Sequence, residues 1–170
     1  MESLQGDSKQ DSPIHTAWKI VPTFLSTSIP RTQSFYADIL GFQASPDHPD
    51  PNTGVPSFLS VAAGKHAAAN IYFHLCRPQD DRPFTPSSTR IFTSTRGLED
   101  LWKLVIAFSS AQNQGMRLEI SKSICNEPWG YREFTIQDPD KNQLTFCRFL
   151  EGGNPGDDTE EHGTDTSVVE

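Results

Sequence analysis

The sequence predicts an α+β fold built from two similar halves, each with a strand, a helix and further strands. Two stretches carry apolar residues at helical spacing, and each is followed by apolar runs of strand length. A four-residue pattern recurs near the start of both halves, as Phe24-x-Ser26-Thr27 and Phe92-x-Ser94-Thr95. This repetition of strand, helix and strands indicates an internal duplication.

The first half is expected over residues 17–76. The apolar stretch 18–25 is β-prone and predicts the opening strand. Ser26, Thr27 and Ser28 then offer N-cap hydroxyls, Pro30 suits the first helical turn, and Gly41 ends the helix. One helical face carries Phe35, Tyr36, Ile39 and Leu40. Apolar runs at 55–62 and 69–76 predict strands after a proline-rich loop at 45–55.

The second half is expected over residues 89–150. The stretch 77–88 that precedes it holds three prolines and is typical of an extended linker. A short strand at Ile91 and Phe92 leads to a helix that ends by Gly115. The apolar positions of this helix are Leu98, Leu101, Trp102, Val105 and Phe108. Strands are predicted at 116–120, 131–137 and 143–150, with a loop at 121–128 and a tight turn at 138–142.

The charge is concentrated at the two ends of the chain. Residues 1–16 hold almost no apolar side chains, and residues 151–170 hold seven acidic residues with no lysine or arginine, so both ends are expected to be disordered. Residues 17–150 then carry a formal charge of about +1. No basic stripe favours nucleic acid. No apolar run suggests a membrane span or a signal peptide, and three cysteines without C-x-x-C spacing argue against a disulfide framework or a zinc site. These patterns favour a reduced, cytoplasmic protein.

Two segments carry a family resemblance. The segment Pro128-Trp129-Gly130-Tyr131-Arg132-Glu133-Phe134, followed by Asp138-Pro139-Asp140-Lys141-Asn142-Gln143-Leu144, resembles the closing hairpin of bleomycin-resistance-type proteins, except that Lys141 stands where glycine is usual. The helix segment from Gln33 to Phe42 is similar to another signature of that family. The chain therefore resembles the vicinal oxygen chelate superfamily, on its glyoxalase/bleomycin-resistance/dioxygenase side. The resemblance implies paired βαβββ modules that form a curved mixed sheet around a cavity.

Metalloenzymes of that superfamily hold a divalent metal between the modules. The resemblance places the four ligand positions on the first and last strands of each module. They fall on Val21 or Pro22, His74, Arg90 or Thr89, and Thr145. Of these residues only His74 can ligate a metal, one imidazole does not hold a catalytic metal, and Arg90 would put a fixed positive charge where the cation belongs. We therefore expect no metal and no cofactor.

The cavity that the resemblance implies would be lined by aromatic and polar side chains. The candidate ligand-binding residues are Phe58, Tyr72, His74, Arg90, Phe92, Trp129 and Arg132. The alternative for the aromatic residues is ordinary core packing, and for Trp129 a partly exposed packing role. Arg132 and Glu133 are neighbours on a predicted strand, so their side chains face opposite ways.

Three functions remain open. The first is a metal-independent protein of bleomycin-resistance type that sequesters an aromatic or glycopeptide-like small molecule. The second is a lyase- or isomerase-type enzyme that uses His74 or Glu133 as the catalytic acid or base. The third is a dimeric scaffold that acts through its acidic tail. A homodimer is expected in each case, because open sheet edges favour association, with pairing of modules either within or between chains.

Overall fold

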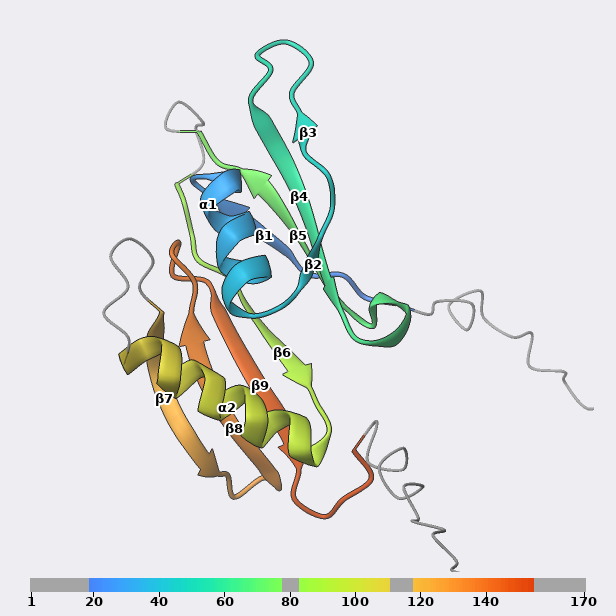
Figure 1. Ribbon diagram of the computed structural model, residues 1–170, viewed down its shortest axis with the longest axis vertical. Coiled ribbons are helices and arrows are strands. Elements are labelled where there is room, and N and C mark those ends of the chain that lie inside the picture. The colour runs from blue at the N-terminus through green and yellow to red at the C-terminus, as the bar shows by residue number, and fades with distance from the viewer. Residues whose placement is uncertain (1–18, 78–82, 111–117, 155–170) are drawn as a thin grey trace, which may run out of the picture.

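The computed structural model describes residues 19–77, 83–110 and 118–154 (Figure 1). The first module contains a four-strand path in the order β1-β5-β4-β2, in which β1 runs parallel to β5. The short strand β3 pairs with the outer part of β4. The elements of the first module are β1 (Thr23–Ser26), α1 (Ile29–Ser34), η2 (Phe35–Ile39), β2 (Gln43–Ala44), β3 (His48–Pro49), β4 (Pro56–Ala63), η3 (Lys65–Ala67) and β5 (Ala69–Leu75).

The second module repeats this topology. Its strand order is β6-β9-β8-β7, and β6 runs parallel to β9. Its elements are β6 (Ser88–Phe92), α2 (Thr95–Ser110), β7 (Glu119–Asn126), β8 (Tyr131–Gln137) and β9 (Gln143–Phe149). In both modules the first strand therefore pairs with the last. The predicted α+β fold and its internal repeat are confirmed.

The four-residue sequence match lies one residue out of phase with the structural repeat. Phe24 pairs with Phe73 and both are buried, whereas Phe92 pairs with Cys147 and is 40% exposed. In the second module the core-facing pair is the partly buried Ile91 with the buried Phe146, so Ile91 is the counterpart of Phe24. Because side chains alternate along a strand, a shift of one residue reverses the face.

Each helix begins near its predicted start. Ile29 and Pro30 open α1, and after Ser34 the helix continues as the single π-helical stretch η2. Gly41 has a φ of 74°, the left-handed conformation that ends such helices. Ser94 caps α2, since its hydroxyl accepts a 3.0 Å hydrogen bond from the amide of Gly97. The predicted helix end at Gly115 lies outside the described residues.

The strand prediction was wrong for four strands. β7 covers Glu119–Asn126, where the sequence predicted a strand ending at 120 and then a loop. β2 and β3 were missed because each is only two residues long, and β3 contains Pro49. The first strand begins at Thr23 rather than at residue 18. Packing also continues past residue 150, because Asn154 is buried and its Oδ1 accepts a 2.6 Å hydrogen bond from the amide of Phe149.

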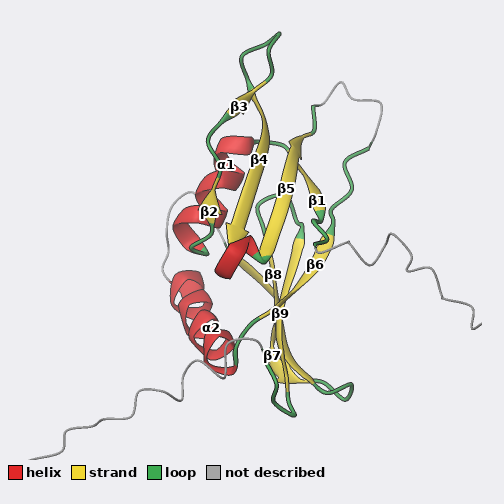
Figure 2. Cartoon of the chain, turned by 90° about the vertical axis from the view of Figure 1, so that its right-hand side faces the viewer, coloured by secondary structure: helices red, strands yellow, loops and turns green. Residues whose placement is uncertain are grey.

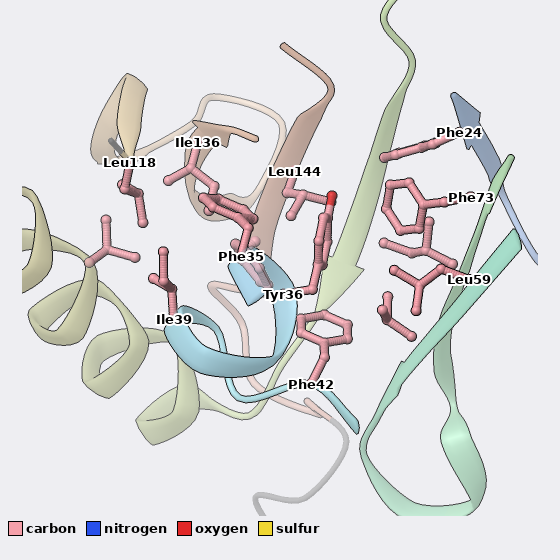
Figure 3. Packing of buried hydrophobic residues seen from close by; sticks show 14 of the residues in the cluster. Phe24, Phe35, Tyr36, Ile39, Phe42, Leu59, Phe73, Leu118, Ile136 and Leu144 are labelled. Carbon is pink, nitrogen blue, oxygen red and sulfur yellow. The ribbon is translucent and has the colours of Figure 1, made fainter. Parts of the chain in front are cut away.

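One hydrophobic core joins the two modules. The first helical segment packs against both modules, with Phe35 and Ile39 toward Ile136 and Leu118 of the second module (Figure 3). On its other side, Tyr36 has its ring centroid 4.8 Å from that of Phe73. The apolar face predicted for this helix is therefore buried from both directions.

The predicted turn at Asp138–Asn142 is confirmed and joins the modules. Asp140 accepts hydrogen bonds from the hydroxyl of Thr27 at 2.5 Å and from Arg31 at 2.6 Å. Asn142 donates to the carbonyl of Leu25 at 3.1 Å. Within the turn, Lys141 has the left-handed conformation, with a φ of 67°.

Both helices lie on the same side of the two sheets (Figure 2). In the described part of the chain no helix covers the opposite side, which we call the open face. The core residues of β4, β5, β8 and β9 point toward the helices, so their sequence neighbours line the open face. No helix among the described residues has both the length and the apolar character needed to cross a membrane.

Candidate ligand site

Aromatic rings cluster on the open face of the second module. Phe92 on β6 stacks on Phe149 of β9, with ring centroids 4.9 Å apart and an interplanar angle of 26°. Tyr131 on β8 meets both rings edge-on, at 5.5 Å and 5.4 Å. Phe92 and Phe149 are 40% and 37% exposed. These three residues form an aromatic platform that leaves apolar ring surface accessible to a ligand.

A buried carboxylate lies beside the platform. Glu133 is on β8, opposite Cys147 of β9, and is only 2% exposed. Its Oε2 is 3.3 Å from Nη2 of Arg90, and its Oε1 is 2.9 Å from Nζ of Lys122. Burial of an unpaired carboxylate is costly, so the two cations offset that cost. The acid predicted as an alternative catalytic residue is thus held between two positive charges.

Lys122 extends this charged group toward the β7–β8 turn. It also pairs with Glu127, and it lies 5.6 Å from the centre of the Trp129 ring. Hydrogen bonds to Glu127 and Glu133 raise the pKa of Lys122, and the bond from Lys122 lowers the pKa of Glu127. Trp129 itself is 56% exposed at the edge of the open face. Trp129 lies in the turn between β7 and β8, and its contact with a ligand stays a prediction.

The open face of the first module carries a second group of rings. Phe58 on β4 has its ring centroid 5.2 Å from those of Tyr72 and His74 on β5. His48 on β3 lies 5.6 Å from Phe58 on the other side. Tyr72 and His74 are both exposed. The structure therefore brings Phe58, Tyr72 and His74 together, as expected for residues of one pocket wall.

A cleft of about 430 Å³ lies at the seam between the modules. Its walls come from the residues just before β1, the first half of β5 and most of β6. The lining residues include Pro22, Asn70, Ile71, Arg90, Ile91 and Phe92. Arg90 and Phe92 are thus the two predicted ligand-binding residues that line the cleft. The volume lies in the range typical of small-molecule sites.

Arg132 lies apart from the other predicted site residues. It shares the helix side of β8 with Phe134, and its Nε donates a 2.7 Å hydrogen bond to Glu99 of α2. A second hydrogen bond of 2.9 Å joins its Nη1 to Asn126. The sequence correctly indicated that Arg132 and Glu133 face opposite ways. The structure assigns the open face to Glu133.

The residues present do not fit the metal of the superfamily's metalloenzymes. The first- and last-strand pairs on the open face are Leu25 with His74 and Phe92 with Cys147. Burial raises the pKa of Cys147 to about 11, so its thiol stays protonated and is a poor ligand. The next pairs along the strands are Thr23 with Tyr72 and Arg90 with Thr145. Among the described residues, no three His, Cys, Asp or Glu side chains gather as a metal site.

Sequence reasoning missed Lys122, Glu127, Tyr131 and Phe149 as members of the site. Simple alternation places Lys122 on the same face as Ile120 of β7, which pairs with Ile136 in the core. The pairing register shifts on both sides of Lys122, and such β-bulges redirect side chains. Tyr131 and Phe149 did carry a signal, because they are cross-strand partners at opposite ends of a recognised hairpin.

Comparison with solved structures supports the same fold. The chain is similar to TioX from Micromonospora sp. ML1, with 15% identity, a TM-score of 0.59, and coverage of 79% of this chain and 100% of that one. It is similar to a glyoxalase/bleomycin resistance protein/dioxygenase superfamily member from Sphaerobacter thermophilus DSM 20745, with 24% identity, a TM-score of 0.58, and coverage of 79% and 98%. A glyoxalase-related enzyme from Clostridium phytofermentans has 19% identity, a TM-score of 0.56, and coverage of 78% and 95%.

The family assignment comes from sequence. A search of curated proteins gives no match. The family model described as Glyoxalase/Bleomycin resistance protein/Dioxygenase superfamily matches residues 20–146, which span both modules from the start of the described chain to the last strand. The chain therefore belongs to the glyoxalase/bleomycin resistance protein/dioxygenase superfamily.

Proposed function

We propose that this protein is a metal-independent small-molecule-binding protein of bleomycin-resistance type, which holds an aromatic compound on its open face. The observation that carries this proposal is the aromatic platform of Phe92, Tyr131 and Phe149 beside the cleft at the module seam. Exposed rings next to a concave apolar surface favour stacking of a flat ligand.

Binding is a better match to the site than acid–base catalysis by the two candidate residues. Both carboxylate oxygens of Glu133 are paired with cations, so a substrate that met this carboxylate would have to displace Arg90 or Lys122. Within the described residues, His74 has the ring of Phe58 as its neighbour and no carboxylate to orient its imidazole. A general base usually has such an orienting partner. We therefore place the lyase- or isomerase-type enzyme second.

Calorimetric titration with the neutral probe 2-(2-naphthyl)ethanol tests the proposal. Saturable binding is expected, with quenching of tryptophan fluorescence because Trp129 borders the site. Phe92→Ala should weaken binding about tenfold, since an aromatic contact and its buried area contribute about 1–2 kcal/mol. Leu104→Ala, which removes an exposed apolar side chain from α2 on the helix side, is the matched control. Equal affinity in both variants, or no saturable binding, would contradict the proposal.

The enzyme alternative has its own measurement. Recovery of the bound probe unchanged after long incubation is expected for a binding protein. Conversion of a small organic substrate that is lost in His74→Ala or Glu133→Gln, with binding retained, would instead establish catalysis. For a scaffold, partner binding would be unchanged by both substitutions and would be lost on deletion of residues 151–170.

We also propose that the protein forms a homodimer. The open face exposes Tyr72, Phe92, Trp129 and Phe149, each at least 36% accessible. Apolar surface of this extent favours association. Light scattering coupled to size-exclusion chromatography should give twice the 18.9 kDa mass of the chain. A concentration-independent monomer mass would rule this out.

A further inference from the structure

We infer that the ligand is an aromatic anion, an aryl carboxylate whose carboxylate binds Arg90 while its rings stack on the platform led by Phe92. This inference rests on the proposed function and names the chemical class of its ligand. The supporting observations are the direction in which charges face, the unused donors of Arg90, and the spacing between Arg90 and Phe92.

Four charged residues lie together on the open face, and the two cations are more exposed than the two carboxylates. The side chains of Arg90 and Lys122 are 49% and 36% exposed, whereas those of Glu133 and Glu127 are 3% and 11% exposed. The formal charges of these four residues cancel. A ligand approaching the sheet nevertheless meets the positive groups first, because the carboxylates lie beneath them. Such an arrangement favours an anion over a cation.

Arg90 retains hydrogen-bonding capacity for a ligand. Its contact with Glu133 uses only Nη2, at 3.3 Å from Oε2 and 3.5 Å from Oε1. Within the described chain, Nε and Nη1 have no protein partner, and both are donors of the planar guanidinium fork. Each parallel donor pair of a guanidinium includes Nη2, which carries two N–H groups, so a ligand carboxylate can accept one bond from Nε or Nη1 and a second from the other N–H of Nη2. The ammonium group of Lys122 has less hydrogen-bonding capacity left for a ligand, since it pairs with both Glu127 and Glu133.

The spacing of Arg90 and Phe92 along β6 sets the distance between the carboxylate and the aromatic ring of the ligand. Arg90 and Phe92 are two residues apart on β6 and both line the cleft. Alternate residues of a strand lie on one face about 6–7 Å apart. A carboxylate joined to a fused aromatic ring by one methylene group spans a similar distance. The cleft adds apolar contacts from Pro22, Ile71 and Ile91.

Three probes with the same ring and different charge test the inference by calorimetry. They are 2-naphthylacetate, 2-(2-naphthyl)ethanol and 2-(2-naphthyl)ethylammonium. The acetate should bind at least tenfold more tightly than the alcohol, which corresponds to about 1.4 kcal/mol, and the ammonium should bind most weakly. Raising the salt concentration should weaken binding of the acetate and leave the alcohol unaffected.

Variants then assign the preference to Arg90. Arg90→Gln should bring the affinity for the acetate close to that for the alcohol. Because this change leaves Glu133 with fewer counter-charges, the double variant Arg90→Gln/Glu133→Gln is measured beside it and should also lose the preference. Arg96→Gln, which removes a guanidinium from α2 on the helix side, should retain it.

The outcomes separate the two proposals. Equal binding of all three probes, tighter binding of the ammonium, or an acetate preference that survives both Arg90 variants would overturn the anionic class and leave the aromatic binding function standing. Absence of saturable binding for every probe would overturn both. Acetate preference that depends on Arg90 supports both.

Discussion

The hydroxyl of Tyr36, in the first module, donates a 3.3 Å hydrogen bond to Oδ2 of Asp138, in the turn between β8 and β9 of the second. Both residues are buried, and burial raises the pKa of Tyr36 well above its usual value, so the hydroxyl keeps its proton. The bond thus ties the helical segment of one module to the closing hairpin of the other.

Tyr36→Phe tests the contribution of this bond to stability. The ring contacts remain, so only the hydrogen bond is lost, and the free energy of unfolding should fall by about 1–2 kcal/mol. Urea unfolding followed by circular dichroism measures the change. Tyr72→Phe is the control, since its hydroxyl lies on the open face and should contribute nothing measurable. Equal stability of the wild type and Tyr36→Phe would show that the bond makes no net contribution.

The carboxyl group of Asp138 predicts a pH dependence of stability. Burial raises its pKa above the ordinary value of 3.8, and hydrogen bonds from Asn142 and from the amide of Asp140 only partly offset this. The folded protein therefore binds this proton more tightly than the unfolded chain does. The contribution of Asp138 is largest at low pH and falls as the pH rises from about 3.8 through the folded-state pKa.

Asp138→Asn removes this titration. The difference in free energy of unfolding between the wild type and Asp138→Asn should therefore shift in favour of the wild type as the pH is lowered from 7 to 4. Urea titrations at several pH values in this interval measure it. A shift toward the variant on acidification would mean that the folded-state pKa is lowered.

Lys141 occupies a backbone conformation that favours glycine. Its φ is 67°, and its exposed side chain pairs with the equally exposed Glu119. Lys141→Gly should raise stability by up to about 1 kcal/mol, because the left-handed conformation costs an L-residue about that much and an exposed ion pair contributes little. Lys141→Ala keeps the backbone cost and should change stability by less than about 0.5 kcal/mol. Equal melting temperatures for Lys141→Gly and Lys141→Ala would show that the turn carries no such cost.

The cysteines should differ in reactivity. Cys147 is fully buried, and burial raises its pKa to about 11, so iodoacetamide at pH 8 should leave it unmodified in the folded protein. Cys125 is partly accessible, and its hydrogen bond to Glu127 raises its pKa. Glu127→Gln should therefore accelerate alkylation of Cys125 without exposing Cys147. Mass spectrometry of timed samples measures both sites, and faster modification of Cys147 would indicate a general loss of packing.

The donor set predicts a protein without a stoichiometric metal. Elemental analysis after purification without chelators should find Fe, Mn, Ni and Zn each far below one atom per chain. Incubation with a chelator should leave the melting temperature and the affinity for 2-naphthylacetate unchanged. One tightly held metal per chain would contradict the metal-independent function.

Sequence alone was sufficient for the parts of the fold set by local patterns. The turn at Asp138–Asn142 and the helix end at Gly41 depend on residues with strong backbone preferences, and both lie where predicted. The course of β7 was not predictable, because its serine and lysine positions are polar. Its strand character comes from pairing with β8 along Glu119–Asn126.

The candidate site was predictable only in part, for a related reason. Phe58, Tyr72 and His74 share one face because β4 and β5 pair in regular register. The four-residue sequence match aligns Phe92 with the buried Phe24, whereas the strand pairing aligns Phe24 with Ile91. The match therefore gives the wrong face of the sheet for the side chain of Phe92. The contact between Lys122 and Glu133 depends on irregular pairing in β7, which no sequence pattern marks.

Because the two modules share one core, neither module is expected to be an independent folding unit. Phe35 and Ile39 lie in the first module, yet they belong to a single buried cluster with Leu98, Ile136 and Leu144 of the second. A fragment limited to residues 17–76 would leave the side chains of Phe35 and Ile39 exposed to water and should not fold alone. Calorimetry of the whole chain should show one cooperative transition. The two modules therefore unfold together, as a single cooperative unit.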